Sequence, residues 1–168
     1  DCVIANAGGD AGYPAWSSRG YDSASIGPWL KAAGYKTGIF GKYQNDYPNT
    51  GSPGYSETYF PPGWDDWRVV MSDRVAYNDY YTLNENGTLN IYRSEAGGYQ
   101  ADILSERLQS FLKATEANDS QPFFAFLSLG APHTPTAPAA RHLSAYPGAT
   151  APRSASFNEP DTSDKPRW

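Results

Sequence analysis

The sequence contains a single cysteine, Cys2, among its 168 residues. One cysteine excludes an internal disulfide and any metal cluster built on several thiolates. No run of five or six like charges occurs and the formal net charge is −5, so we expect no nucleic-acid partner held by bulk positive charge. The longest apolar stretch, residues 123–129, is far shorter than the roughly 20 residues that cross a bilayer, and the N-terminus shows no signal-peptide pattern. We therefore expect no membrane span.

Aromatic residues are plentiful, with 5 Trp, 13 Tyr and 7 Phe making up 15% of the chain. Such large side chains bury much apolar area and are scarce in disordered proteins, so a folded chain is expected. The 16 Gly and 14 Pro predict extensive loops. Because the chain starts at Asp1 and ends in a polar, proline-containing stretch at Trp168, we expect a segment of a longer protein.

Local patterns predict two helix–strand units. Residues 25–34 have the composition of a short helix that ends at a glycine, and residues 35–40 follow as a strand. Apolar residues recur at helical spacing over about residues 99–115, and the apolar run 123–129 follows. A strand that is apolar on both faces suits a sheet covered on both sides, so we expect 123–129 to be a central, parallel strand.

The segment between these units, residues 45–93, is rich in glycine, proline and aromatics and is expected to leave the core as an excursion. Within it, residues 80–92 predict an antiparallel hairpin, because Asn86-Gly87 suits the positive φ angles of a tight turn. The fold class is therefore α/β, with a mostly parallel sheet and an inserted antiparallel hairpin.

Two residues that carry chemistry follow the two expected parallel strands. Lys42 comes just after the first strand, and His133 lies in the loop after the second. Ligands of open α/β sheets bind outside the carboxyl ends of the strands, where neighbouring parallel strands bring their loops together. A lysine and a histidine at one edge suit an anionic substrate whose leaving oxygen needs a proton or a hydrogen-bond donor.

Other polar residues are weaker candidates. Asp65 and Asp66 could offer carboxylates to a metal ion, but their position between two tryptophans is more typical of turn residues, and Asp46 and Asp79 are interpreted in the same way. His142 has no evident partner in the sequence. Two sequons, at Asn86 and Asn118, are candidate glycosylation sites and are consistent with a secreted protein.

Four segments resemble the sulfatase family, particularly the branch of N-acetylglucosamine-6-sulfatases and similar arylsulfatases. They are LKAAGYKTGIFGKYQNDY at 30–47, PPGWDDW at 61–67, YYTLN at 80–84 with Asn86-Gly87, and PFFAFLSLGAPHTP at 122–135. These segments occur in the family's order and cover most of residues 25–138. The resemblance implies that residues 1–168 are an internal fragment of one catalytic domain with a partial alkaline-phosphatase-like (sulfatase) sandwich.

The resemblance implies a sulfuric ester hydrolase acting on a sulfated small molecule or a sulfated sugar. Lys42 matches the family lysine that contacts the sulfate group, and His133 matches the family histidine that faces the sulfate or the leaving oxygen. Many sulfatases carry a second histidine shortly after the lysine, and Asn45 stands near that position here. A secreted, extracellular or lysosome-like location is expected for such an enzyme.

The resemblance also implies a calcium ion held by Asp and Asn ligands and a nucleophile derived from cysteine, a formylglycine hydrate. Neither is supplied here, because the family's Cys-x-Pro/Ala-x-Arg motif and its Asp-Asp and Asp-Asn metal pairs are missing. The residues after Cys2 do not fit the motif. We therefore assign no metal ligand in this chain, expect the rest of the parent catalytic domain to complete the site, and expect the chain alone to be inactive.

Two alternatives remain open from the sequence. The first is a non-catalytic carbohydrate-binding module that uses aromatic side chains as stacking surfaces, namely Trp64, Trp67, Tyr77, Tyr80 and Tyr81. The second is a related hydrolase of phosphate or phosphonate esters. The natural substrate and the oligomeric state are not fixed by the sequence, because substrate choice depends on loops that vary independently of the chemistry.

Overall fold

The computed structural model describes residues 11–48, 56–76, 80–117, 119–134 and 136–166. The chain divides into a larger unit, residues 1–137, and a smaller one, residues 138–168. The described part of the smaller unit holds one 3-10 turn, η3 (Ala140–His142), within otherwise irregular and mostly exposed chain. All the other elements lie in the larger unit.

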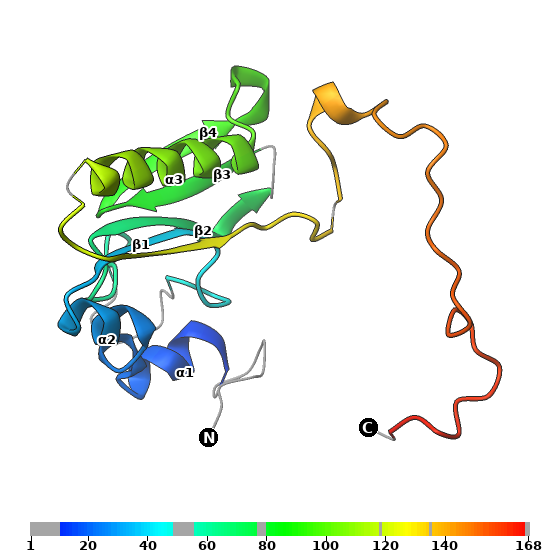
Figure 1. Cartoon of the computed structure of the whole chain (residues 1–168), viewed down its shortest axis with the longest axis horizontal. Helices are drawn as coiled ribbons and strands as arrows, with labels where there is room; N and C mark the ends of the chain where they lie inside the picture. The colour runs from blue at the N-terminus through cyan, green and yellow to red at the C-terminus, as the bar shows by residue number, and fades with distance from the viewer. Residues whose placement is uncertain (1–10, 49–55, 77–79, 118, 135, 167–168) are drawn as a thin grey trace. The chain divides into compact units, whose positions relative to one another are not determined.

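The larger unit is built on one mixed sheet of five strands in the order β4-β3-β2-β1-β5 (Figure 1). The strands are β1 (Lys36–Gly41), β2 (Asp66–Ala76), β3 (Tyr80–Glu85), β4 (Thr88–Arg93) and β5 (Phe123–Ser128). β1 runs parallel to both β2 and β5, whereas β3 and β4 add an antiparallel hairpin beside β2. The predicted α/β class and the hairpin are confirmed.

Helices cover both faces of this sheet. α1 (Gly12–Ser18) and α2 (Ile26–Ala32) lie on one side and α3 (Gln100–Glu116) on the other (Figure 1). The 3-10 turns η1 (Tyr21–Ser23) and η2 (Ser94–Ala96) join neighbouring elements. The helices expected at 25–34 and 99–115 are both present. No helix in the part of the chain that the structure describes is long and apolar enough to cross a membrane.

The core follows from the alternation of side chains along each strand, which sends neighbouring residues to opposite faces. One cluster joins α1 to the sheet and contains Tyr13, Ile39, Tyr47, Trp64, Trp67 and Val69. The other packs under α3 and contains Phe40, Val70, Tyr81, Leu83, Leu104 and Phe111. Ile39 and Phe40 are adjacent in sequence and belong to different clusters, so β1 is buried on both sides.

The expectation that residues 45–93 leave the core is wrong. β2 lies in the middle of the sheet, between β1 and β3, and its Trp67 is fully buried. The apolar run from Trp67 to Met71 is interrupted by Arg68 and preceded by two aspartates, so the local composition does not indicate a buried strand. β2 is recognised as a strand by its parallel pairing with β1, which is distant in sequence.

The expectation for residues 123–129 is half confirmed. β5 is parallel to β1, as predicted, but it lies at the edge of the sheet formed by the described strands rather than at its centre. Phe126 and Leu127 are 47% and 40% exposed. Within this sheet the central position belongs to β2, and β1 lies between β2 and β5. An apolar composition on both faces shows what a strand can bury, not which neighbours it has.

Candidate functional site

Lys42 lies directly beside the end of β5. β1 and β5 stay in register to their last residues, where Gly41 pairs with Ser128, and the Lys42 backbone N–H donates to the Ser128 carbonyl oxygen at 2.7 Å. The loop that carries His133 begins immediately after Ser128. The chain therefore leaves β1 and β5 at the same edge of the sheet (Figure 1), as the sequence predicted for Lys42 and His133.

Gly41 makes this close approach possible. Its φ angle is +113°, and a Cβ atom built there would stand 1.9 Å from the Ser128 carbonyl oxygen. Any other residue would both strain the backbone and push the two strands apart. The glycine before the lysine is thus required by the packing of β1 against β5 at the place where Lys42 begins.

His133 is held in a turn that follows β5. Its backbone N–H donates to the Gly130 carbonyl oxygen at 2.9 Å, and its ring atom Nδ1 lies 2.7 Å from the Thr134 carbonyl oxygen. A carbonyl oxygen only accepts, so Nδ1 carries a hydrogen in this arrangement and Nε2 is the remaining ring nitrogen. The exposed ring can therefore present Nε2 as an acceptor when neutral or as an N–H donor when protonated.

Asn45 shares the loop of Lys42. Its backbone oxygen accepts a hydrogen bond from the backbone N–H of Tyr13, at the start of α1, at 2.8 Å. Tyr47, two residues further on, is fully buried. Its hydroxyl donates to the Tyr59 carbonyl oxygen and accepts from Asn84 Nδ2 at 3.2 Å. The loop from Lys42 to Tyr47 is therefore fastened to β5, to α1 and to β3.

A buried carboxylate that the sequence analysis did not single out lies under this loop. Asp22, in η1, is only 5% exposed and accepts hydrogen bonds from four side chains. These donors are Tyr13 Oη (3.2 Å), Trp16 Nε1 (3.0 Å), Tyr43 Oη (3.1 Å) and Tyr59 Oη (3.2 Å). They come from three separate segments of the chain, so no local motif marks the cluster.

The tyrosines around Asp22 keep their protons at neutral pH. Burial, followed by the negative charge of Asp22, raises the pKa of the Tyr43 and Tyr13 hydroxyls far above the usual range. The same two causes raise the pKa of Tyr59 to about 12. All three hydroxyls are therefore donors under physiological conditions, which suits a carboxylate that can only accept.

Asp65 and Asp66 both have structural partners. Asp65 lies in a bend before β2, in line with the interpretation as a turn residue, whereas Asp66 is the first residue of β2, so that interpretation is wrong for Asp66. Asp65 pairs with Lys31 and with Lys36 (3.4 Å) and accepts from the Thr37 backbone N–H at 3.0 Å, so it fastens α2 and the start of β2 to the first residues of β1. Asp66 pairs with Arg68 at 2.6 Å. Burial acts to raise the pKa of Asp65, but the hydrogen bonds from Lys31 and Thr37 outweigh it and the pKa is lowered.

No group of three or more His, Cys, Asp or Glu side chains that could hold a metal ion occurs within the described ranges. Asp46 is an exposed turn residue with φ at +63°, and Asp79 lies outside the described residues, as does Cys2. The donor set present in these ranges does not fit a calcium ion. We therefore derive no chemistry through a metal from this chain.

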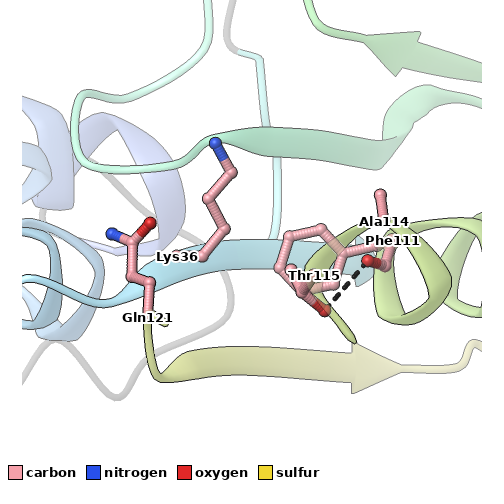
Figure 2. Close-up of a pocket in the computed structure, with 5 residues that line it drawn as sticks. All are labelled: Lys36, Phe111, Ala114, Thr115 and Gln121. Carbon is pink, nitrogen blue, oxygen red and sulfur yellow. Dashed lines mark hydrogen bonds between the residues drawn. The ribbon is translucent and has the colours of Figure 1, made fainter. Parts of the chain in front are cut away.

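A cavity of about 300 Å³ opens near the C-terminal end of α3, beside Lys36 at the start of β1, whereas Lys42 follows the end of that strand. Figure 2 shows its lining, which consists of Lys36, Phe111, Ala114, Thr115 and Gln121. The ammonium of Lys36 is engaged by Asp65, and the Thr115 hydroxyl donates to carbonyl oxygens of its own helix. None of the predicted site residues lines this cavity, so it is not the predicted site.

The aromatic residues proposed as sugar-stacking surfaces do not form one. Trp64, Trp67 and Tyr81 are buried in the two core clusters. The guanidinium of Arg93 lies 4.9 Å from the ring centre of Tyr80, and Tyr77 lies outside the described residues. Buried rings cannot stack on a sugar, so a binding module of this design is not favoured.

Of the two candidate glycosylation sites, only Asn86 can be placed, because Asn118 lies outside the described residues. Asn86 and Gly87 have φ angles of +52° and +88°, which confirms the predicted tight turn of the hairpin. The exposed Asn86 side chain accepts from the Trp67 backbone N–H at 2.7 Å, and its Nδ2 donates to Asp66 at 3.0 Å. A glycan on Nδ2 would still leave one N–H for that bond.

Comparison with known proteins gives consistent matches. The family model described as Sulfatase matches residues 5–162. A Sulf-1 homolog of Caenorhabditis elegans, named as an extracellular sulfatase, is 33% identical over 150 residues, covering 88% of this chain and 20% of the relative. An N-acetylglucosamine-6-sulfatase of Capra hircus is 34% identical over 128 residues, covering 74% of this chain and 22% of the relative.

Among solved structures, one titled as BT4656 in complex with its substrate D-glucosamine-2-N,6-O-disulfate aligns with a TM-score of 0.53 at 24% identity. It covers 78% of this chain and 23% of that chain. At this identity the likeness supports the fold, which is that of a sulfatase. The chain spans about a fifth of the length of the curated relatives that it matches.

Proposed function

This chain belongs to the Sulfatase family, and from that premise we propose that it supplies sulfate-contacting side chains to an enzyme that hydrolyses sulfate esters. The observation that carries the proposal is the hydrogen bond from the Lys42 backbone N–H to Ser128, which sets the Lys42 loop beside the loop that carries His133. The residues that carry an ammonium group and an imidazole thus follow two strands that end at the same edge of the sheet.

Each side chain has a separate task in this proposal. The positive charge of Lys42 offsets the charge on the sulfate oxygens as the ester bond breaks. Nε2 of His133 donates a proton or a hydrogen bond to the leaving oxygen, with Nδ1 fixed by Thr134. The Asn45 amide can donate a hydrogen bond to a sulfate oxygen but cannot transfer a proton as an imidazole does.

We propose that residues 1–168 are part of one catalytic domain and that the nucleophile and metal site come from its other segments. The continuous family match over residues 5–162 and the short span relative to known sulfatases support this. In such an enzyme a Cys-derived formylglycine would supply the nucleophile and calcium would neutralise sulfate charge. The chain alone, with calcium added, is expected to hydrolyse no aryl sulfate, and clear turnover would mean that the nucleophile lies within these residues.

We further propose a sulfated sugar as the substrate and an extracellular or lysosome-like location. The support is that the relatives reported above are named as an N-acetylglucosamine-6-sulfatase and as an extracellular sulfatase. Glycans on Asn86 and Asn118 fit the same location. A mass decrease on treatment with a peptide N-glycosidase, absent when both asparagines are replaced by Gln, tests that part of the proposal.

The decisive test uses the full-length protein that contains this chain. Lys42→Ala and His133→Ala are each expected to lower kcat/KM on an aryl sulfate by roughly 10²-fold or more, because each removes a group that stabilises charge or transfers a proton. Lys113→Ala, an exposed lysine of α3, is the matched control and should leave kcat/KM unchanged. Wild-type kcat/KM in both site variants would overturn the proposal. A higher rate on the matching aryl phosphate than on the sulfate would favour a phosphate ester hydrolase instead.

A further inference from the structure

The Asp22 cluster is a built site that the proposed chemistry does not use. A carboxylate buried this deeply normally has a cation beside it, since burial of a charge is costly without a partner. None of the ion pairs found among the described residues includes Asp22. Its charge is instead satisfied by three tyrosine hydroxyls and one indole N–H.

One of these four donors belongs to the site loop itself. Tyr43 directly follows Lys42, and its hydroxyl is bonded to Asp22 Oδ1 at 3.1 Å. Its ring makes edge contacts with Trp67 and Tyr47, at 5.0 and 5.6 Å between ring centres. The Lys42 backbone is fixed on one side by its hydrogen bond to Ser128 and on the other by Tyr43, whose hydroxyl bonds to the buried Asp22 carboxylate.

We propose that Asp22 is a positioning residue for Lys42, acting through the hydroxyl of Tyr43. The inference rests on the proposed function, because it assigns Lys42 the sulfate contact. A lysine side chain is long and flexible, so its ammonium is aimed largely by the backbone from which it starts. The carboxylate ties that backbone to η1 and, through Tyr13 and Trp16, to α1, which also binds the site loop at the Asn45 carbonyl oxygen.

The other donors give the proposal its internal control. Tyr59 donates to the same carboxylate at 3.2 Å, but it belongs to the segment before β2 and is not adjacent in sequence to any residue of the site loop. The bond from the Tyr47 hydroxyl is to the Tyr59 backbone carbonyl oxygen, which a change of the Tyr59 side chain leaves in place. Tyr43→Phe and Tyr59→Phe therefore each remove one hydroxyl donor from the same carboxylate, at Oδ1 and Oδ2 respectively, and keep the ring. If Asp22 serves only to stabilise the fold, the two variants should behave alike.

The experiment compares these variants in the full-length protein with an aryl sulfate as substrate. Tyr43→Phe is expected to lower kcat/KM about tenfold, because small displacements of a catalytic group cost rate, whereas Tyr59→Phe should stay within about twofold of wild type. Asp22→Asn, which keeps the shape but replaces one acceptor oxygen by a donor, should lower kcat/KM at least as much as Tyr43→Phe. Thermal unfolding of each variant verifies that it is folded, and Tyr43→Phe serves alone if Asp22→Asn does not fold.

A double-mutant cycle shows whether the effect passes through Lys42. In a Lys42→Ala background, Tyr43→Phe should lower kcat/KM by less than about twofold, since the group that it positions is gone. Equal losses from Tyr43→Phe and Tyr59→Phe, or a full tenfold loss from Tyr43→Phe in the Lys42→Ala background, would overturn the inference. Failure of the proposed function is distinguishable, because then Lys42→Ala alone would leave the activity unchanged.

Discussion

The substitution Gly41→Ala tests how the end of β1 sets up the site. The new Cβ atom would stand 1.9 Å from the Ser128 carbonyl oxygen and 2.7 Å from its carbon, both of which are backbone atoms of β5. These atoms cannot rotate away as a side chain can. The strands must separate, and the hydrogen bond from the Lys42 backbone N–H to Ser128, now 2.7 Å long, is lost or weakened.

The cost has three parts. An alanine at φ +113° pays about 1–3 kcal/mol for the backbone conformation. Overpacking against backbone adds about 1–3 kcal/mol, and the lost hydrogen bond about 1 kcal/mol. Gly34→Ala isolates the first part, since Gly34 also has a positive φ, +89°, but nothing lies within 4 Å of its added Cβ. Gly41→Ala should therefore be more destabilising than Gly34→Ala by at least about 2 kcal/mol.

Urea unfolding of the 168-residue chain, followed by tryptophan fluorescence, measures this difference, because Trp64 and Trp67 are buried beside β1. In the full-length protein Gly41→Ala should also lower kcat/KM, since Lys42 begins at the displaced atom, while Gly34→Ala should not. Equal unfolding free energies for the two variants would refute the argument that contact with Ser128 requires the glycine.

Two further predictions concern stability and association. Burial acts to raise the pKa of Glu85, but hydrogen bonds from Arg107, Tyr92 and Asn90 outweigh it, so the pKa is lowered. The stabilisation by Glu85 is therefore complete at neutral pH and is lost as the pH falls through the lowered pKa. Glu85→Gln should lower the free energy of unfolding by about 1–3 kcal/mol at pH 7 and by less at pH 3, as measured by urea titrations at the two pH values. A loss of unfolding free energy that is as large at pH 3 as at pH 7 would contradict this. Leu127 is an exposed residue of the edge strand β5, so Leu127→Lys should change the unfolding free energy by under about 0.5 kcal/mol. The added charge should also reduce self-association of the chain, measured by light scattering. Marked destabilisation would show that the Leu127 side chain is buried.

The features that were predicted correctly depend on short stretches of sequence. Asn86-Gly87 forms the hairpin turn because these two residues tolerate positive φ angles wherever they occur. The α3 helix follows from apolar spacing within residues 100–116. That the Lys42 and His133 loops leave the sheet at the same edge followed from two strands being parallel, and the register of β1 with β5 confirms this.

What the sequence by itself determined was therefore the local elements, the turn and the pair of candidate side chains. Only the tertiary structure decided that β2 lies in the core, that β5 lies at the edge of the described sheet, and that Asp22 collects donors from distant segments. The physical reason is that strand order and buried hydrogen bonds depend on partners far away in the chain. The residues next to a side chain in sequence indicate whether it can be buried or hydrogen-bonded. Which distant residue it packs against or bonds with is decided only in the folded chain.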